Sequence, residues 1–287
     1  MAHNPYEPSI AGTQALPPYA CTGVKVFAFP LLADAVPLQN LCNQFLNIAP
    51  LTAGITFEPK LSAPNTCNLV IEAIDYKSLR VPTPPWDDFG EVPQKELLFS
   101  FPVLRKQGGV LVEEGIFIPY IFVDDQASSF TGREVVGLPK LLAGFTLDRN
   151  FPVSQPIRIR FQERRSGGPV RMADLVKIST INTIAPLTLP TLPNTSSMFG
   201  FSTRVLINPQ STATDSFRSI MRCVYATNAS GLSFLPPARV ALTPIVRLDI
   251  QATLGIRSDA FGHVVSLSPY SIEADFSLEG VTTVWAS

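Results

Sequence analysis

Proline is the residue that most limits how this chain can fold, because it occupies 27 of the 287 positions. A proline in the middle of a sheet removes a backbone donor, so we expect the prolines to mark strand ends and long loops. Between them lie short apolar or alternating runs, bounded by Pro, Gly, Asn and Asp, which indicate strands. These runs cover residues 25–31, 69–74, 96–103, 109–112, 116–123, 157–161, 204–207, 246–250 and 271–278. The sequence therefore predicts a mainly β, or α+β, protein.

Turn and helix signals add to this prediction. The run Gln107-Gly108-Gly109 lies between two strand candidates and predicts a hairpin turn, and a second break falls at 166–169. Sequential antiparallel pairing is the simplest topology. The best helix candidate is 36–47, because four apolar side chains share one face at helical spacing there: Leu38, Leu41, Cys42 and Phe45. This helix is short enough to be a lid or a covering element.

Two long loops are expected. Residues 80–93 are rich in proline and lead directly into the strand that begins at Glu96, so they could form one wall of a pocket. Residues 183–214 are rich in Pro, Thr and Ser and predict a loop extension of a single domain spanning 1–287. That extension could cover a site, contact a neighbouring subunit or be disordered.

The composition limits the classes of partner. Hydrophobic residues make up 46% of the chain and charged residues 16%, against a usual charged fraction of about 25%. A large core or a buried subunit interface follows. The net charge is −1 and no basic block is present, so the sequence gives no electrostatic reason to expect nucleic acid as a partner. A small-molecule partner is the better interpretation.

Neither targeting nor metal motifs stand out. The N-terminus lacks the positive region and apolar core of a signal peptide, which predicts a cytoplasmic protein. No uninterrupted apolar run approaches the ~18 residues of a membrane span, so no membrane association is expected. The four cysteines are scattered without a C-x-x-C pair, which argues against a metal site or a disulfide framework. We interpret them as buried thiols.

Lys140 is the best candidate for a chemical centre. It follows Pro139 in an otherwise apolar run, and no other ionisable side chain occurs between Glu134 and Asp148. A normal lysine has a pKa of about 10.4 and is rarely neutral near pH 7. Burial among aliphatic neighbours disfavours the ammonium and lowers the pKa. A neutral amine can attack a ketone and form a Schiff base.

A family resemblance supports this hypothesis. Gly132-Arg133-Glu134, four residues, and then Pro139-Lys140 resembles the signature of the acetoacetate decarboxylase family, whose lysine forms an imine with its substrate. The segment 96–103 is similar to the family segment in which an active-site glutamate precedes a strand that ends in Pro-Val. Segments 264–270 and 275–280 also resemble the closing strands of the family. The match is uneven and runs over most of the chain.

The resemblance implies several properties. The fold would be an acetoacetate decarboxylase-like antiparallel β-barrel, or cone, with a few short helices and long loops. Lys140 would be the nucleophile and Glu96 the matching acid or base, and the enzyme would need no cofactor. Together with the apolar composition, the resemblance favours a homo-oligomer. Gly132, Arg133, Glu134 and Pro139 would form the structural motif around the lysine.

Two departures from the family pattern concern the substrate-binding positions. The decarboxylase signature has a second lysine directly after the first, and this chain has Leu141 there. If a neighbouring cation were needed to lower the lysine pKa, Lys140 would be disabled, whereas if desolvation dominates, the leucine does no harm. The family also brings an arginine from its N-terminal region, where this chain offers only Lys25, one residue out of register. On an alternating strand, an offset of one residue points to the opposite face.

Other charged residues have simpler interpretations. An adjacent Arg-Glu after glycine is typical of a structural turn, so we take Arg133 and Glu134 as scaffold. Glu113 with Glu114, and Asp124 with Asp125, are predicted on solvated turns.

Three functional hypotheses remain. The first is a cofactor-independent lyase in which Lys140 forms a Schiff base with a small β-keto or 2-oxo acid, with decarboxylation favoured. The second is an aldolase or dehydratase that acts on a 2-oxo acid through the same lysine. The third is non-covalent binding or catalysis in the same cavity, with Lys140 only pairing with an anionic ligand.

Overall fold

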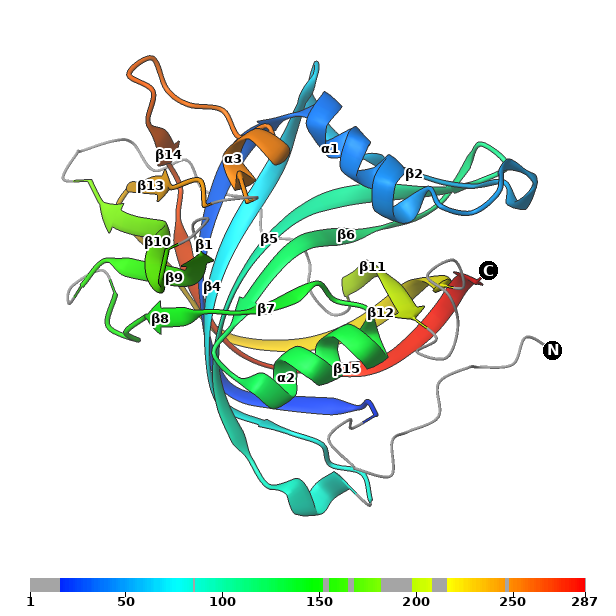
Figure 1. Cartoon of the computed structure of the whole chain (residues 1–287), viewed down its shortest axis with the longest axis horizontal. Helices are drawn as coiled ribbons and strands as arrows, with labels where there is room; N and C mark the ends of the chain where they lie inside the picture. Colours follow the sequence, from blue (N-terminus) through cyan, green and yellow to red (C-terminus); the bar gives the residue numbers. More distant parts are fainter. Residues whose placement is uncertain are drawn as a thin grey trace.

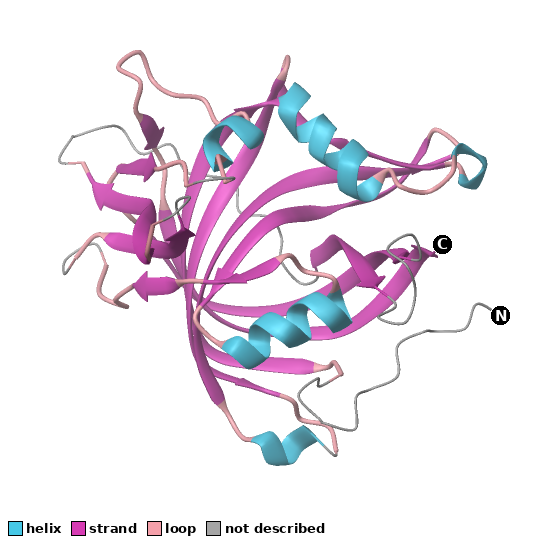
Figure 2. Ribbon diagram, viewed as in Figure 1, coloured by secondary structure: helices cyan, strands magenta, loops and turns pink. Residues whose placement is uncertain are grey.

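The computed structural model describes residues 16–84, 86–151, 155–164, 168–181, 198–207, 216–245 and 248–286. Its strands are β1 (Tyr19–Asp34), β2 (Ile55–Pro59), β3 (Leu61–Ala63), β4 (Thr66–Arg80), β5 (Val92–Gln107), β6 (Val110–Val123), β7 (Lys140–Leu142), β8 (Gly144–Thr146), β9 (Ile157–Arg164), β10 (Val170–Thr180), β11 (Met198–Ile207), β12 (Ser216–Phe234), β13 (Ala238–Leu242), β14 (Val264–Ser266) and β15 (Tyr270–Ala286). Its helical segments are α1 (Ala35–Leu41), η1 (Cys42–Leu46), η2 (Leu51–Ala53), η3 (Trp86–Phe89), α2 (Gln126–Thr131), η4 (Gly132–Val136) and α3 (Ile250–Thr253). Figures 1 and 2 show that strands dominate and helices are few and short, as predicted.

The larger sheet is ring-like. Its strand order is β2-β5-β4-β1-β15-β12-β11-β6-β7, and an additional β5–β6 pairing returns the path to β5. The strands of this sheet are long and strongly curved (Figure 1). A smaller sheet, in the order β14-β13-β10-β9-β8, lies beside it.

The predicted topology is partly wrong. The first and last strands of the described chain, β1 and β15, pair with each other, so pairing is not simply sequential. Most pairs are antiparallel, but β6 pairs in parallel with β7 and with β11, which makes the sheet mixed. A strand order that joins the chain ends depends on distant contacts, which local turn signals do not encode.

Among the described residues, three prolines lie inside strands away from the strand ends, which corrects the expectation that all of them mark ends and loops. Pro30 lies past the last β1–β15 pair and is paired only with β4. Pro102 lies past the last β4–β5 pair. Pro119 lies between the part of β6 that pairs with β11 and the part that pairs with β7, beside a register shift toward β5. A missing donor costs least at such one-sided or irregular positions.

Two strand predictions also change. The runs 109–112 and 116–123 belong to one strand, β6, so Glu113 and Glu114 lie within a strand and not on a turn. Of the run 246–250, residues 248–250 are described and do not form a strand: Leu248 makes only an isolated bridge with Ile245, and α3 begins at Ile250. The predicted hairpin at Gly108 and Gly109 is confirmed, because both glycines have the positive φ that a two-residue turn requires (57° and 81°).

The predicted helix at 36–47 is also confirmed, as α1 followed by the π-helical turn η1. Leu38, Leu41 and Cys42 of this segment are buried in the main core. The segment is therefore a covering element. The predicted extension at 183–214 lies outside the described residues except for 198–207, and these form strand β11.

The main core spans both sheets. Phe27 and Phe29 point from one face of β1 toward Phe151 and the small sheet, with an edge-on ring contact between Phe27 and Phe151 at 5.6 Å. A second cluster of buried side chains belongs to strands of the larger sheet and includes Val24 of β1, Ile74 of β4 and Leu98 of β5. All four cysteines are buried free thiols, as predicted. In the described ranges, no helix is long and apolar enough to cross a membrane.

Candidate active site

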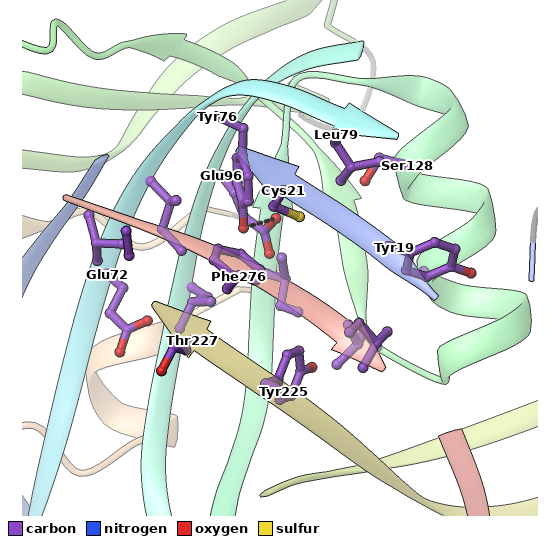
Figure 3. A pocket seen from close by; sticks show the side chains of 18 of the residues that line it. Tyr19, Cys21, Glu72, Tyr76, Leu79, Glu96, Ser128, Tyr225, Thr227 and Phe276 are labelled. Carbon is purple, nitrogen blue, oxygen red and sulfur yellow. Dashed lines mark hydrogen bonds between the residues drawn. The ribbon is translucent and has the colours of Figure 1, made fainter. Parts of the chain in front are cut away.

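A cavity of about 780 Å³ lies within the ring (Figure 3). Residues from β1, β4, β5, β6, β12 and β15 form most of its wall, and α2, η4 and the start of β7 complete it. The side chains are mainly aliphatic or aromatic. The predicted 80–93 loop does form part of the wall, through Arg80, Val81, Gly90 and Val92.

Lys140 points into this cavity. It is the first residue of β7, where it pairs in parallel with Ile121, and only 7% of its surface is exposed. Its Nζ donates a hydrogen bond to Ser128 Oγ at 2.9 Å and lies 3.6 Å from Glu96 Oε2. The neighbours of Lys140 in sequence are aliphatic, but a hydroxyl and a carboxylate reach its amine from other elements.

The signature around Lys140 forms a compact turn. Gly137 adopts the left-handed conformation that ends η4, with φ at 77°, and the backbone then turns into β7. Leu138 N donates to Gly132 O at 2.9 Å, and Lys140 N donates to Leu138 O at 2.8 Å. Gly132 has a second role, because a Cβ there would lie 2.5 Å from Lys140 Cδ and 2.7 Å from Cε. Only glycine leaves room for the lysine side chain.

Glu96 is held by two donors as well as by the lysine. Gln94 Nε2 donates to its Oε2 at 2.6 Å and Tyr76 OH donates to the same oxygen at 3.2 Å. Burial, followed by the Glu96 charge, raises the pKa of Tyr76 well above its usual value, so the phenol stays a donor. This buried network fixes the carboxylate beside the amine. The structure thus brings together the two residues predicted as catalytic.

Several further polar groups line the cavity. Burial raises the pKa of the Cys21 thiol to about 12, and the Glu96 charge adds to this effect. Burial also raises the pKa of Tyr225 well above its usual value. Burial, with a smaller contribution from Glu96, raises the pKa of Glu72 to about 7. At neutral pH, the Cys21 thiol and the Tyr225 phenol therefore remain protonated, and Glu72 is partly protonated and partly ionised.

Sequence reasoning missed Glu72, Tyr76, Gln94 and Ser128. The alternation of Glu72, Ile74 and Tyr76 along β4 was available as a signal that these three side chains share one face. Which face surrounds a cavity depends on the curvature of the whole ring, and no local pattern gives that. Ser128 belongs to α2, a helix that the sequence analysis did not predict.

The two predicted substrate-binding residues do not reach the cavity. Val26 and Ala28 of β1 line it, whereas Lys25 lies on the opposite face of that strand, 3.4 Å from Glu273. The one-residue offset therefore has the consequence expected for an alternating strand. Leu141 likewise alternates away from Lys140 and packs against the main core. The side chain at position 141 faces hydrophobic residues outside the cavity. A lysine there, as in the family signature, would not place its charge inside the cavity.

The other motif residues surround the site without forming it. Arg133 and Pro139 are exposed, Glu134 is half-buried, and none of the three lines the cavity. Asp125 caps the N-terminus of α2 by accepting a hydrogen bond from Ser128 N at 2.6 Å, so it does not lie on a solvated turn as predicted. Within the described part of the chain, no group of three or more His, Cys, Asp or Glu side chains is placed to hold a metal ion.

The fold and the site define a class of protein: a ring-like β sheet whose apolar cavity holds a buried lysine–glutamate pair. Residues 72–199 match the family model of acetoacetate decarboxylase. No curated protein sequence matches the chain.

Solved structures with the same fold support this match. Acetoacetate decarboxylase from Legionella pneumophila is 18% identical, with a TM-score of 0.65 over 96% of this chain and 90% of that one. A second acetoacetate decarboxylase is 13% identical, with a TM-score of 0.58 over 96% and 92% of the two chains. The enduracididine biosynthesis enzyme MppR is 16% identical, with a TM-score of 0.57 over 98% and 93%. This chain therefore shares the fold of solved acetoacetate decarboxylases, and its residues 72–199 are similar to that family.

Proposed function

We propose that this protein is a cofactor-independent lyase in which Lys140 forms a Schiff base with the carbonyl group of a β-keto or 2-oxo acid. The observation that carries this proposal is the buried amine of Lys140, which faces the cavity and lies 2.9 Å from Ser128 Oγ and 3.6 Å from Glu96 Oε2. A carbonyl carbon placed in the cavity beside Nζ can be attacked once the amine is neutral.

The surrounding groups can perform the proton transfers. Glu96 accepts a proton from the ammonium, and the neutral amine then adds to the carbonyl carbon to form a carbinolamine. Glu96 returns that proton to the hydroxyl, which leaves as water and gives the protonated imine. Gln94 and Tyr76 hold Glu96 in place through both steps. Ser128 orients the lysine amine.

For a β-keto acid, the imine serves as the electron sink. The bond to the carboxylate carbon breaks, carbon dioxide leaves, and the electron pair neutralises the imine as an enamine. Protonation of the enamine carbon and addition of water then release the ketone and free Lys140. The apolar wall favours this step because a carboxylate is converted to a neutral product.

The same imine also serves an aldolase or dehydratase that acts on a 2-oxo acid. One observation supports this alternative: MppR, which has the same fold, has been solved in complex with the condensation product of pyruvate and imidazole 4-carboxaldehyde. A non-covalent role is the third possibility, in which the ammonium of Lys140 pairs with an anionic ligand.

Reduction with borohydride distinguishes covalent from non-covalent function. We expect intact-protein and peptide mass spectrometry to find a reduced adduct on the Lys140 peptide after incubation with a panel of β-keto and 2-oxo acids. The mass of the adduct identifies the substrate class, and release of carbon dioxide separates decarboxylation from aldol chemistry. Lys140→Ala should give no adduct. Lys140→Arg retains a positive charge without the nucleophile, so retained activity in this variant would overturn the covalent mechanism.

A cytoplasmic location and a homo-oligomeric state are also proposed. The low charged fraction of the chain and the exposed apolar side chains at the β5–β6 hairpin, among them Val110 and Val112, support self-association. Light scattering coupled to size-exclusion chromatography measures the subunit number directly, and cell fractionation tests the location.

A further inference from the structure

The geometry of the cavity points to a substrate that carries a large apolar group, such as a long acyl chain or an aryl ring, in addition to its oxo-acid head. This inference rests on the proposed function and narrows its substrate class. It differs from the sequence-based expectation of a small oxo acid, because the cavity is much larger than such a molecule.

The volume is the first argument. The cavity of about 780 Å³ lies in the upper part of the ~300–1,000 Å³ range of pockets that enclose drug-sized ligands. A four-carbon oxo acid has so few heavy atoms that it fills roughly a quarter of this space, even if each atom takes the ~30 Å³ of a water molecule. Most of the cavity would then hold only water.

The chemistry of the wall is the second argument. Six lining residues belong to one hydrophobic cluster, which we call the apolar lobe: Tyr19, Val81, Val136, Leu138, Tyr225 and Leu278. Tyr19, Leu278 and Tyr225 are register partners on adjacent strands β1, β15 and β12, so they form one continuous surface. Such a wall offers water few hydrogen bonds. Burial of an apolar group against it is favourable by about 25 cal/mol of free energy for each Å² of apolar surface removed from water.

The apolar lobe lies within reach of the reacting amine. Leu138 of the lobe lies two residues before Lys140, and its carbonyl oxygen accepts a hydrogen bond from Lys140 N at 2.8 Å. In Figure 3, Tyr19 and Glu72 lie on opposite sides of Glu96. A substrate whose carbonyl meets Lys140 can therefore extend its apolar group into the lobe, away from Glu72.

This arrangement also has a catalytic consequence. Binding energy from a remote part of the substrate can hold the carbonyl carbon against the lysine amine. A short oxo acid lacks that part and is free to occupy unproductive positions in the cavity. We therefore expect a strong preference for bulky substrates in kcat/KM.

The test is a series of 3-oxo and 2-oxo acids that differ only in chain length, together with phenyl-substituted members. We expect trapping by borohydride, and kcat/KM for turnover, to rise at least tenfold from the shortest acid to the best long-chain or aryl acid. Equal or better reaction of the shortest acid would overturn the inference while leaving the proposed function intact.

Two variants on the same strand locate the binding of the apolar group. Leu278→Trp fills the apolar lobe, and Ile272→Trp adds similar volume on the wall away from it. We expect Leu278→Trp to reduce the preference for long over short acids at least tenfold, and Ile272→Trp to retain it. Circular dichroism and the melting temperature check that each variant folds. Equal preferences in both folded variants would contradict the assignment of the lobe.

Binding to Lys140→Ala separates the two proposals. If no acid gives an adduct with the wild-type protein, the proposed function fails. Calorimetry with Lys140→Ala then still tests the cavity: tighter binding of the long-chain acid than of its shortest homologue supports the inference, and equal or weaker binding contradicts it.

Discussion

At the scale of single residues, Gly132 has an unusually direct link to the reactive amine. A Cβ at this position would lie 2.5 Å from Lys140 Cδ, and both residues are buried. We predict that Gly132→Ala folds but displaces the lysine side chain. Because a misplacement of about 1 Å can cost about 100-fold in rate, adduct formation measured by borohydride trapping should fall by one to two orders of magnitude.

Gly280→Ala is the matched control for this substitution. Gly280 lies in β15 of the ring-like sheet; like Gly132 it does not have a positive φ, but a Cβ there meets nothing within 4 Å. This control should form the adduct at the wild-type rate. Unchanged trapping in Gly132→Ala would show that the lysine side chain has another path into the cavity.

Glu72 predicts a specific dependence of stability on pH. Burial and the Glu96 charge raise the pKa of this carboxyl from 4.5 to about 7 in the folded protein. Between these values, the folded state binds more protons than the unfolded state, so the contribution of Glu72 lowers stability as the pH rises through this window. Glu72→Gln removes this penalty, and we expect a gain of about 1 to 3 kcal/mol in the free energy of unfolding at pH 8.

The gain should be much smaller at pH 5, where Glu72 is protonated in the folded protein. Urea unfolding at the two pH values measures the difference, and Glu91→Gln, which changes an exposed carboxylate, serves as the control. An equal gain from Glu72→Gln at both pH values would mean that the effect is one of packing and not of ionisation.

At the scale of elements, α2 positions Ser128 beside the amine of Lys140. The carboxylate of Asp125 caps this helix by accepting from Ser128 N at 2.6 Å. Loss of such a cap costs about 1 kcal/mol, and here it also frees the residue whose hydroxyl accepts from Lys140 Nζ. We predict that Asp125→Ala lowers stability and slows adduct formation together.

Asp249→Ala is the matched control, because Asp249 caps α3 in the same way through Ala252 N at 3.1 Å and does not line the cavity. It should lower stability by a similar amount and leave trapping unchanged. If both variants slowed trapping equally, the effect would reflect global stability and not the position of Ser128.

Elements with strong local signals could be predicted from the sequence. The apolar face of 36–47 predicts α1 with η1, and Gly108-Gly109 predicts the hairpin between β5 and β6. The break expected between 112 and 116 is absent, because Glu113 pairs with Arg222 of β12 and Glu114 pairs with Lys60 between β2 and β3, so both can remain within β6. Short elements such as α2 and α3 lack enough residues to show a period, so their caps were interpreted as turns or strand.

For the whole molecule, the site could be predicted only in part. The signature around Lys140 and the strand at Glu96 could be identified locally, but the closing of the ring is what brings their side chains within 3.6 Å. The same closure turns Glu72, Tyr76 and Tyr225 inward and leaves Lys25 outside. A cavity is a property of the curvature of all strands together, so its size, which decides the substrate class, has no signature in any one segment.

The ring closes at a narrow seam between β6 and β11, which share only two described residue pairs, Gly200 with Ile116 and Phe201 with Phe117. Glu113 of β6 reinforces this seam. Its Oε1 accepts from Arg222 Nε of β12 at 2.7 Å, on the far side of β11, and its Oε2 lies 3.4 Å from Arg105 Nε of β5. The carboxylate therefore joins β6 to its hairpin partner β5 and to β12, which is distant in sequence.

We predict that Glu113→Gln lowers the free energy of unfolding by about 1 to 3 kcal/mol, because it leaves two largely buried guanidinium groups close together without their shared counter-charge. The neighbouring Glu114→Gln is the control, since its pair with Lys60 is half exposed and contributes only about 0 to 1 kcal/mol. Urea unfolding measures both variants. Because Ile116 at this seam also lines the cavity, Glu113→Gln should weaken binding of a bulky oxo acid in calorimetry, whereas Glu114→Gln should not. Equal stability of the two variants would show that backbone pairing alone closes the ring.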